Sequence, residues 1–222
     1  MSDSFSVTER NRVRRRAQRA RYDHATVYSI LDEALICHVA FQVNDQPFAI
    51  PTIHARIEET LYMHGSTANR MLEALSQGAP VCVTVTLIDG LVLARSAFHH
   101  SMNYRSVTVF GRAAVVEDSS EKLRAFEALV ERMVPGRWSD TRPPSPEEMQ
   151  ATTVIRLAIE EASAKVRTGD PVDDQADLAL PHWAGVVPLD LRPARPLPAA
   201  DLREDIEVPP YLRDLGTPRA SS

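Results

Sequence analysis

Residues 93–111 read LARSAFHHSMNYRSVTVFG, and this stretch decides how the chain is interpreted. It places arginine, histidine, asparagine, tyrosine and serine side chains between two apolar runs of strand-like character. Polar side chains gathered between two strands are typical of a binding pocket at the edge of a sheet. The sequence therefore predicts a polar pocket here.

A second polar cluster lies upstream at residues 64–70, which read HGSTANR. It stands where a strand-like segment, residues 60–63, gives way to a helical pattern that begins near Thr67. Unpaired backbone N–H groups and the helix dipole both favour an anion at a helix N-terminus. Two polar clusters at strand ends therefore predict a phosphorylated ligand.

Length and composition indicate one β-rich domain. The chain has 222 residues, and Cys37 and Cys82 lie in apolar runs without the spacing of a metal or redox motif, which predicts buried thiols and no disulfide. No apolar run reaches the roughly 20 residues that a membrane span needs, and no signal peptide is evident. We expect a cytoplasmic protein.

Charge is uneven along the chain. The net charge is −5, yet residues 10–21 read RNRVRRRAQRAR. Such an arm can bind nucleic acid, pack on a partner subunit or remain solvated, and on an acidic chain nucleic acid is the least favoured of the three. We expect three regions: a basic arm at 1–21, a β-rich domain at 22–188 and a proline-rich, partly ordered tail at 189–222.

The expected elements alternate strands with single helices. Helices are predicted at 22–33 with Asp23 as N-cap, at 67–76, and from Ser119 or Ser120 to about 133. Strands are predicted at 35–43, 47–57, 61–63, 81–88, 107–116, 153–159 and 163–167, with a hairpin turn at 44–46. Short connections favour a largely antiparallel barrel with peripheral helices over a parallel doubly wound sheet.

Several motifs in this order resemble a known family. They are IPTIHAR (50–56), YMHGSTANRML (62–72), residues 80–111, SAKVR (163–167) and WAG (183–185). Together they resemble the flavin-nucleotide-binding branch of the pyridoxamine 5′-phosphate oxidase-like split β-barrel proteins, which also contains nitroimidazole reductases. The resemblance implies a mainly β fold with peripheral helices, a homodimer, and FMN at the subunit interface; other members bind haem or a deazaflavin there.

The resemblance also implies site residues. Ser66 and Arg70, with Asn69 as a weaker candidate, match the FMN phosphate site, and Pro51, Thr52 and Ile53 match the strand beside the isoalloxazine ring. The remaining cofactor positions are Tyr104, Arg105 and Ser106 near the ribityl chain, and Lys165, Arg167 and Trp183, which approach the partner's cofactor. Candidates on the substrate side are His64, which also counts among the cofactor residues, His99, His100 and Tyr104. The complete C-terminal signature of true pyridoxamine phosphate oxidases is absent, so oxidation of vitamin B6 is not expected.

Other histidines have simpler interpretations. His38 and His54 lie on strands and are predicted to be structural. His99 and His100 could bind a metal or haem, but adjacent histidines on a strand point to opposite faces and rarely chelate together, so no metal site is predicted.

The predicted function is an FMN-dependent oxidoreductase with an unidentified small organic substrate. No glycine-rich dinucleotide loop is present, so NAD(P)H would bind only transiently as electron donor. The alternatives are a split-barrel protein that binds haem or a deazaflavin, a flavin-binding protein without turnover, and a nucleic-acid binder that uses the arginine arm.

Overall fold

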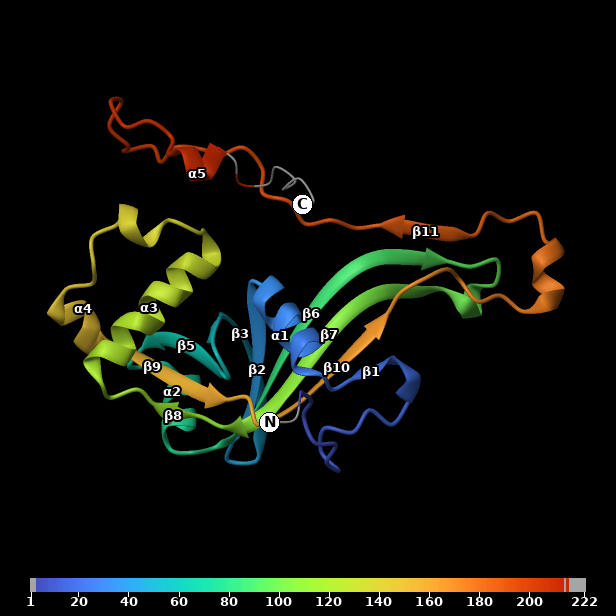
Figure 1. The fold of residues 1–222 in the computed structure, drawn as a ribbon, viewed down its shortest axis with the longest axis horizontal. Helices are drawn as coiled ribbons and strands as arrows, with labels where there is room; N and C mark the ends of the chain where they lie inside the picture. Colours follow the sequence, from blue (N-terminus) through green and yellow to red (C-terminus); the bar gives the residue numbers. More distant parts are fainter. Residues whose placement is uncertain (1–2, 214, 216–222) are drawn as a thin grey trace.

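Two antiparallel sheets form the framework of the computed structural model, which describes residues 3–213 and 215 (Figure 1). Among these residues the larger sheet follows the order β1 (Ala20–Arg21), β10 (Glu161–Arg167), β7 (Ser101–Arg112), β6 (Pro80–Leu93), β2 (Ile36–Val43) and β3 (Gln46–Ile53), and β11 (Gly185–Pro188) also pairs with β6. The smaller sheet follows the order β4 (Ala55–Ile57), β5 (Thr60–Ser66), β9 (Thr152–Ala158) and β8 (Ala114–Val115). The fold is the expected split antiparallel β-barrel with peripheral helices.

Helices lie at the periphery of the two sheets. They are α1 (His24–Glu33), α2 (Arg70–Ser76), α3 (Ser119–Met133), α4 (Pro146–Ala151) and α5 (Pro210–Arg213), with short 3-10 helices η1 (Ala17–Arg19), η2 (Ala97–His99), η3 (Trp138–Asp140) and η4 (Gln175–Ala179). The α1 cap is confirmed, because an Asp23 carboxylate oxygen accepts the Thr26 N–H at 2.8 Å. The predicted cap of α3 is wrong: Asp118, rather than either serine, accepts the Glu121 N–H at 2.7 Å. No helix among the described residues is long and apolar enough to cross a membrane.

The turn between β2 and β3 is confirmed, but the strand after it is divided. Asn44 and Asp45 have φ values of 49° and 63°, as a two-residue type I′ turn requires. The strand predicted at 47–57 breaks at His54, where the chain leaves the larger sheet and enters the smaller one. His54 is 1% exposed, and its Nε2 lies 3.0 Å from the Leu31 carbonyl oxygen. Its predicted structural role agrees with this burial.

The polar segment at 93–106 is not a loop between short strands. β6 continues to Leu93 and β7 begins at Ser101, so the expected strands at 81–88 and 107–116 are wrong at their facing ends. The two strands form a long curved hairpin that projects from the barrel as an arm with η2 at its tip (Figure 1). Backbone pairing holds these polar residues in strands, since β7 pairs with β6 as far as Ser101 and Val92.

β6 has different neighbours along its length. Its first part pairs with β2 through Cys82 to Thr84, and its outer part pairs with β11. Gly90 lies at this outer pairing, where an added Cβ would come within 3.1 Å of the Val187 carbonyl oxygen. The glycine therefore permits β11 to approach.

The barrel interior is apolar and includes part of the N-terminal arm. Valines on β6 and β7 pack with Met63, Ile155 and the buried face of α1. Phe5 is 7% exposed and belongs to the same core, and β1 pairs with β10. Both cysteines are free as expected, with Cys37 buried and Cys82 half-buried.

The C-terminal tail is largely irregular and returns across the molecule. It runs from β11 towards the end of α3, as Figure 1 shows. There the Arg137 Nη1 donates to the Tyr211 hydroxyl at 3.0 Å, and that hydroxyl donates to Asp140 at 2.6 Å. The part of the predicted tail at 214 and 216–222 lies outside the described residues.

Candidate functional site

The predicted site residues fall into two groups far apart along the long axis of the molecule (Figure 1). One group, here called the edge group, lies on β3, on β5 and at the start of α2: Pro51, Thr52, Ile53, His64, Ser66, Asn69 and Arg70. The other group lies on the outer parts of the hairpin arm and β10: His99, His100, Tyr104, Lys165 and Arg167. Within one chain the two groups do not form a single site.

The start of α2 differs from the open helix terminus that the sequence suggested. The helix begins at Arg70 rather than Thr67, and Asn69 is its N-cap. The Asn69 side-chain oxygen accepts the Met71 N–H at 2.9 Å and the Leu72 N–H at 3.4 Å. The N-terminus of α2 is therefore less open than the sequence suggested, because the cap already uses two of these donors.

Arg70 remains available to an anion. Its guanidinium lies 5.1 Å from the centre of the Phe48 ring, and no carboxylate pairs with it among the described residues. It lines a cavity of about 450 Å³ with Gln42, Asn44 and Glu73. Ser66, at the end of β5, is exposed as well.

The rest of the edge group follows the open side of β3 and the middle of β5. β3 is an outer strand of the larger sheet, so one of its edges has no pairing strand in the described chain. His64 is half-buried beside Phe126, with the ring centroids 5.5 Å apart, and its Nδ1 is buried without a hydrogen-bond partner. Burial lowers the pKa of His64, so its neutral form is favoured.

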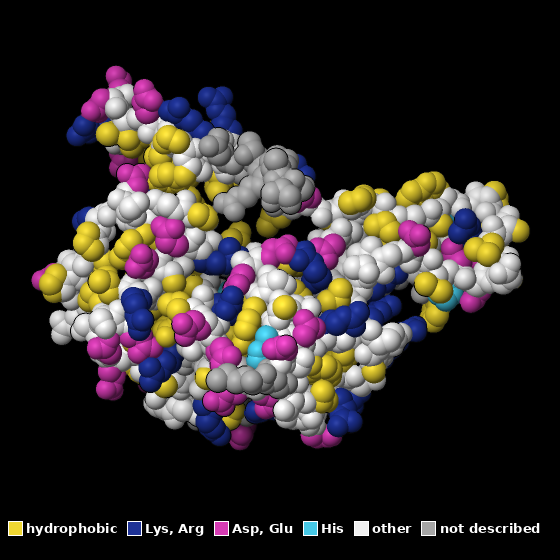
Figure 2. Space-filling model, viewed as in Figure 1, with side chains coloured by type: hydrophobic (Ala, Val, Ile, Leu, Met, Phe, Trp, Pro, Cys, Tyr) yellow, Lys and Arg dark blue, Asp and Glu magenta, His cyan; other side chains and the backbone are white. Residues whose placement is uncertain are grey.

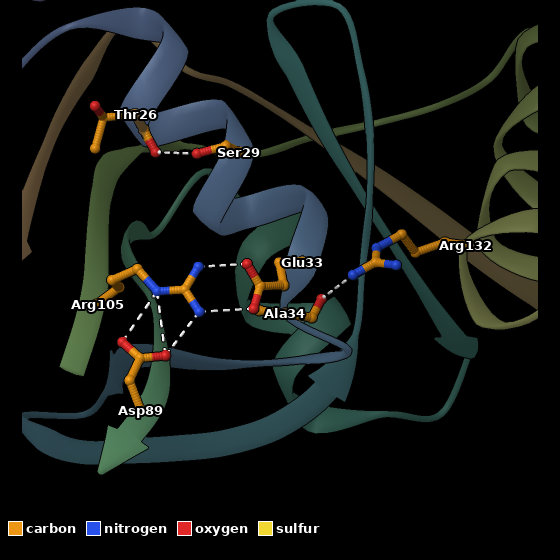
Figure 3. Close-up of polar contacts among 7 residues, drawn as sticks. All are labelled: Thr26, Ser29, Glu33, Ala34, Asp89, Arg105 and Arg132. Atoms are coloured by element: carbon orange, nitrogen blue, oxygen red, sulfur yellow. Dashed lines mark hydrogen bonds and ion pairs between the residues drawn. The ribbon is translucent and has the colours of Figure 1, made fainter. Parts of the chain in front are cut away.

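Arg105 has an electrostatic role that the sequence did not reveal. Figure 3 shows its guanidinium between the carboxylates of Glu33, at the end of α1, and Asp89, on β6. Its Nη2 donates to Glu33 Oε1 and to Asp89 Oδ1, both at 2.7 Å. Hydrogen bonds to Glu33 and then to Asp89 raise the pKa of Arg105. Its guanidinium is thus engaged by protein, and its neighbour Ser106 donates to the Lys165 carbonyl oxygen at 3.4 Å.

All of the second group except Tyr104 lines a basic cavity of about 600 Å³. Cationic side chains dominate its wall, together with two histidines and two apolar residues: Arg15, Arg16, Arg19, Lys165, Arg167, His99, His100, Phe98 and Val172, with Ser101 and Asp174. Figure 2 shows Lys and Arg side chains gathered where the hairpin arm leaves the body. The sequence predicted Lys165, Arg167 and the two histidines as site residues, but it did not predict Arg15, Arg16 and Arg19. The basic run at residues 10–21 was the feature that could have pointed to these three arginines.

Most of the positive charge in this basic cavity has no carboxylate partner among the described residues. Arg15, Arg16, Arg19 and Lys165 make no ion pair within the described chain. Arg167 is 6% exposed, and its guanidinium donates to the Gly169 carbonyl at 3.0 Å and the Asp170 carbonyl at 3.1 Å, while its Nε is buried without a partner. Burial, and then the charge of Arg19, lower the pKa of Arg167.

The two histidines are oriented differently. They belong to the 3-10 helix η2 and its C-cap, so the expectation that they lie on a strand is wrong. His99 Nε2 lies 3.3 Å from an Asp174 carboxylate oxygen. His100 Nδ1 lies 3.0 Å from the Ser96 carbonyl oxygen, and a carbonyl can only accept, so Nδ1 carries the proton. The Nε2 of neutral His100 then has a free lone pair.

Trp183 lies apart from the basic cavity. It is 67% exposed, and an added Cβ on Gly185 would come within 2.9 Å of its ring. In the described part of the chain no three metal-binding side chains converge.

Comparison with known proteins gives the family. The family model for pyridoxamine 5′-phosphate oxidase matches residues 23–166. No curated protein matches the sequence.

Two solved structures resemble nearly the whole chain. The flavocytochrome Anf3 from Azotobacter vinelandii is 40% identical, with a TM-score of 0.88 over 94% of this chain and 97% of that one. An FAD- and haem-binding protein from Mycobacterium smegmatis is 36% identical, with a TM-score of 0.85 over 89% and 97%. A putative 5-nitroimidazole antibiotic resistance protein from Bacteroides thetaiotaomicron, 23% identical with a TM-score of 0.57 over 66% and 86%, shares the fold. The chain therefore belongs to the pyridoxamine 5′-phosphate oxidase family.

Proposed function

We propose that the protein is a flavin- and haem-binding oxidoreductase that works as a homodimer. The observation that carries this proposal is the 40% and 36% identity, over nearly the whole chain, to a flavocytochrome and to an FAD- and haem-binding protein. That the flavin is FMN remains a prediction. FAD is the alternative, because the second of these proteins binds FAD.

The edge group is the proposed flavin site. Arg70 lies over Phe48, near the start of β3, and Pro51, Thr52 and Ile53 lie further along the same strand. A strand rises about 3.3 Å per residue, so about 13 Å separate Phe48 from Thr52. This separation would let the flavin phosphate lie near Phe48 and Arg70 while the flavin ring lies near Thr52. Arg70 would grip the phosphate with a charge-assisted bond, and the bare edge of β3 would offer backbone groups to the ring.

A second copy of the chain would cover the exposed edge and the arm. Phe98 is 88% exposed, Leu191 88% and Leu197 89%, and Figure 2 shows hydrophobic side chains along the arm and the tail. Apolar groups of this size gain free energy when another surface covers them. A two-fold arrangement would also bring the arm of one subunit towards the edge group of the other.

A bound flavin supplies hydride and single-electron transfer, and the protein positions it. His64 is held neutral beside Phe126 and is the residue proposed to orient a substrate. NAD(P)H remains the proposed transient donor, and the cytoplasm the proposed location.

The absorption spectrum of the freshly purified protein tests the cofactors. A flavin band near about 450 nm together with a Soret band is the expected result. Acid extraction and chromatography then distinguish FMN, FAD and a deazaflavin, and light scattering measures the dimer. A protein with neither chromophore after growth with riboflavin and haem precursors contradicts the proposal, and flavin that no donor reduces would indicate binding without turnover.

A further inference from the structure

We propose that the basic cavity is the haem site, where His100 would bind the iron through Nε2 and the arginines of the N-terminal arm would pair with the haem propionates. This assignment rests on the proposed function, in which the chain carries haem as well as flavin.

The first argument is charge. Five cationic side chains line the cavity, and the single carboxylate there, Asp174, lies beside His99. Cations this close together repel one another unless an anion joins them. Arg16 also has a φ of 59°, a left-handed conformation that non-glycine residues rarely adopt. The cavity is therefore suited to an anionic ligand.

The second argument is the apolar part of the wall. Phe98 is 88% exposed and Val172 is 76% exposed, although both line the cavity. A volume of about 600 Å³ falls within the range of cofactor pockets. A flat macrocycle with two carboxylates would contact these apolar side chains and still reach the arginines.

The third argument is the state of His100. Its Nδ1–H donates to the Ser96 carbonyl, an arrangement that fixes the ring and leaves Nε2 as the ligating atom, as in most metal-binding histidines. His99 is the less suitable neighbour, because its own Nε2 faces Asp174. A diphosphate would satisfy the arginines equally well but would give this oriented imidazole no function.

The experiment compares the wild type with His100→Ala, His99→Ala and the double variant Arg15→Ala/Arg19→Ala, all produced with added haem. Haem per subunit, flavin per subunit and the Soret and low-temperature EPR spectra are measured. We expect His100→Ala to lose the histidine-ligated spectrum and to bind haem about tenfold or more weakly, with imidazole restoring the spectrum. His99→Ala should keep the wild-type spectrum. The double arginine variant should bind haem about tenfold more weakly without a change in ligation.

Three results would overturn the assignment. An unchanged haem spectrum in His100→Ala, while the wild type holds both cofactors, would place the iron elsewhere and leave the proposed function intact. Loss of flavin instead of haem in the arginine variant would assign the basic cavity to the diphosphate of FAD. A wild type that holds flavin and never haem would remove the haem part of the proposed function together with this assignment.

Discussion

Arg105 donates from Nη2 to Glu33 Oε1 at 2.7 Å, and this bond ties the middle of β7 to the C-terminal end of α1. Asp89 on β6 holds the same guanidinium from the other side. One arginine thus joins a helix and two neighbouring strands, and it keeps two carboxylates from facing each other without a counter-charge (Figure 3).

Replacing Arg105 by alanine should lower stability and leave flavin binding unchanged. The side chain is 29% exposed, so solvent weakens each pair, and we expect a loss of about 1 to 2 kcal/mol in the free energy of unfolding. Arg112→Ala is the matched control, because Arg112 lies on the same strand and its side chain donates to the Gly78 carbonyl and makes no ion pair within the described part of the chain. Urea unfolding with flavin titration measures both effects. Loss of flavin with unchanged stability would return Arg105 to the cofactor site.

Arg70→Ala should weaken FMN binding much more than riboflavin binding, because only FMN carries the phosphate. We expect a loss of about 1.5 to 3 kcal/mol for FMN, the range for a hydrogen bond to a charged group. Calorimetric titration of protein freed of cofactor compares the two ligands. Equal losses for both would mean that Arg70 acts through its packing on Phe48.

The two thiols should react at very different rates. Burial raises the pKa of the Cys37 thiol to about 12, so almost no thiolate forms near neutral pH. Cys82 is half-buried and more accessible. Limited treatment with iodoacetamide followed by mass spectrometry should label Cys82 first. Faster labelling of Cys37 in the native protein would contradict this order.

Stability should fall as the pH falls from about 8 to about 5.5, and His54 should contribute to the loss. Burial lowers the pKa of His54 below its ordinary value of 6.5. The unfolded chain therefore takes up a proton that the folded chain does not, and acid favours unfolding. Burial lowers the pKa of His64 as well, so His64 contributes to the loss in the same direction.

His54→Gln should flatten the dependence of the urea midpoint on pH, whereas His38→Gln, on an exposed position of β2, should not. Parallel profiles for all three proteins would show that His54 does not titrate with unfolding.

Local signals explain the elements that the sequence predicted well. Asp23 and the apolar spacing after it define α1, and the Asn44-Asp45 turn defines the β2–β3 hairpin. Both depend on residues only a few positions apart. The break at His54 was missed because strand-like residues continue on both sides of it while the chain changes sheets.

The candidate site was predicted only in part, for a physical reason. The outer part of β7 is polar, so it lacks the apolar alternation by which a strand is recognised in a sequence. The pairing of β1 with β10 brings three arginines of the N-terminal arm, Arg15, Arg16 and Arg19, beside Lys165 and Arg167. The spacing of residues within one segment cannot predict a contact between segments so far apart in the sequence.

The pairing of β1 with β10 also sets an order for synthesis. β1 is translated before β10, and both long hairpin strands and α3 are translated between them. The edge of the nascent sheet must stay unpaired during that interval, and long-range pairings of this kind form slowly. We expect the arginines of the arm to protect it while it waits, because like charges keep the exposed segments of neighbouring nascent chains apart.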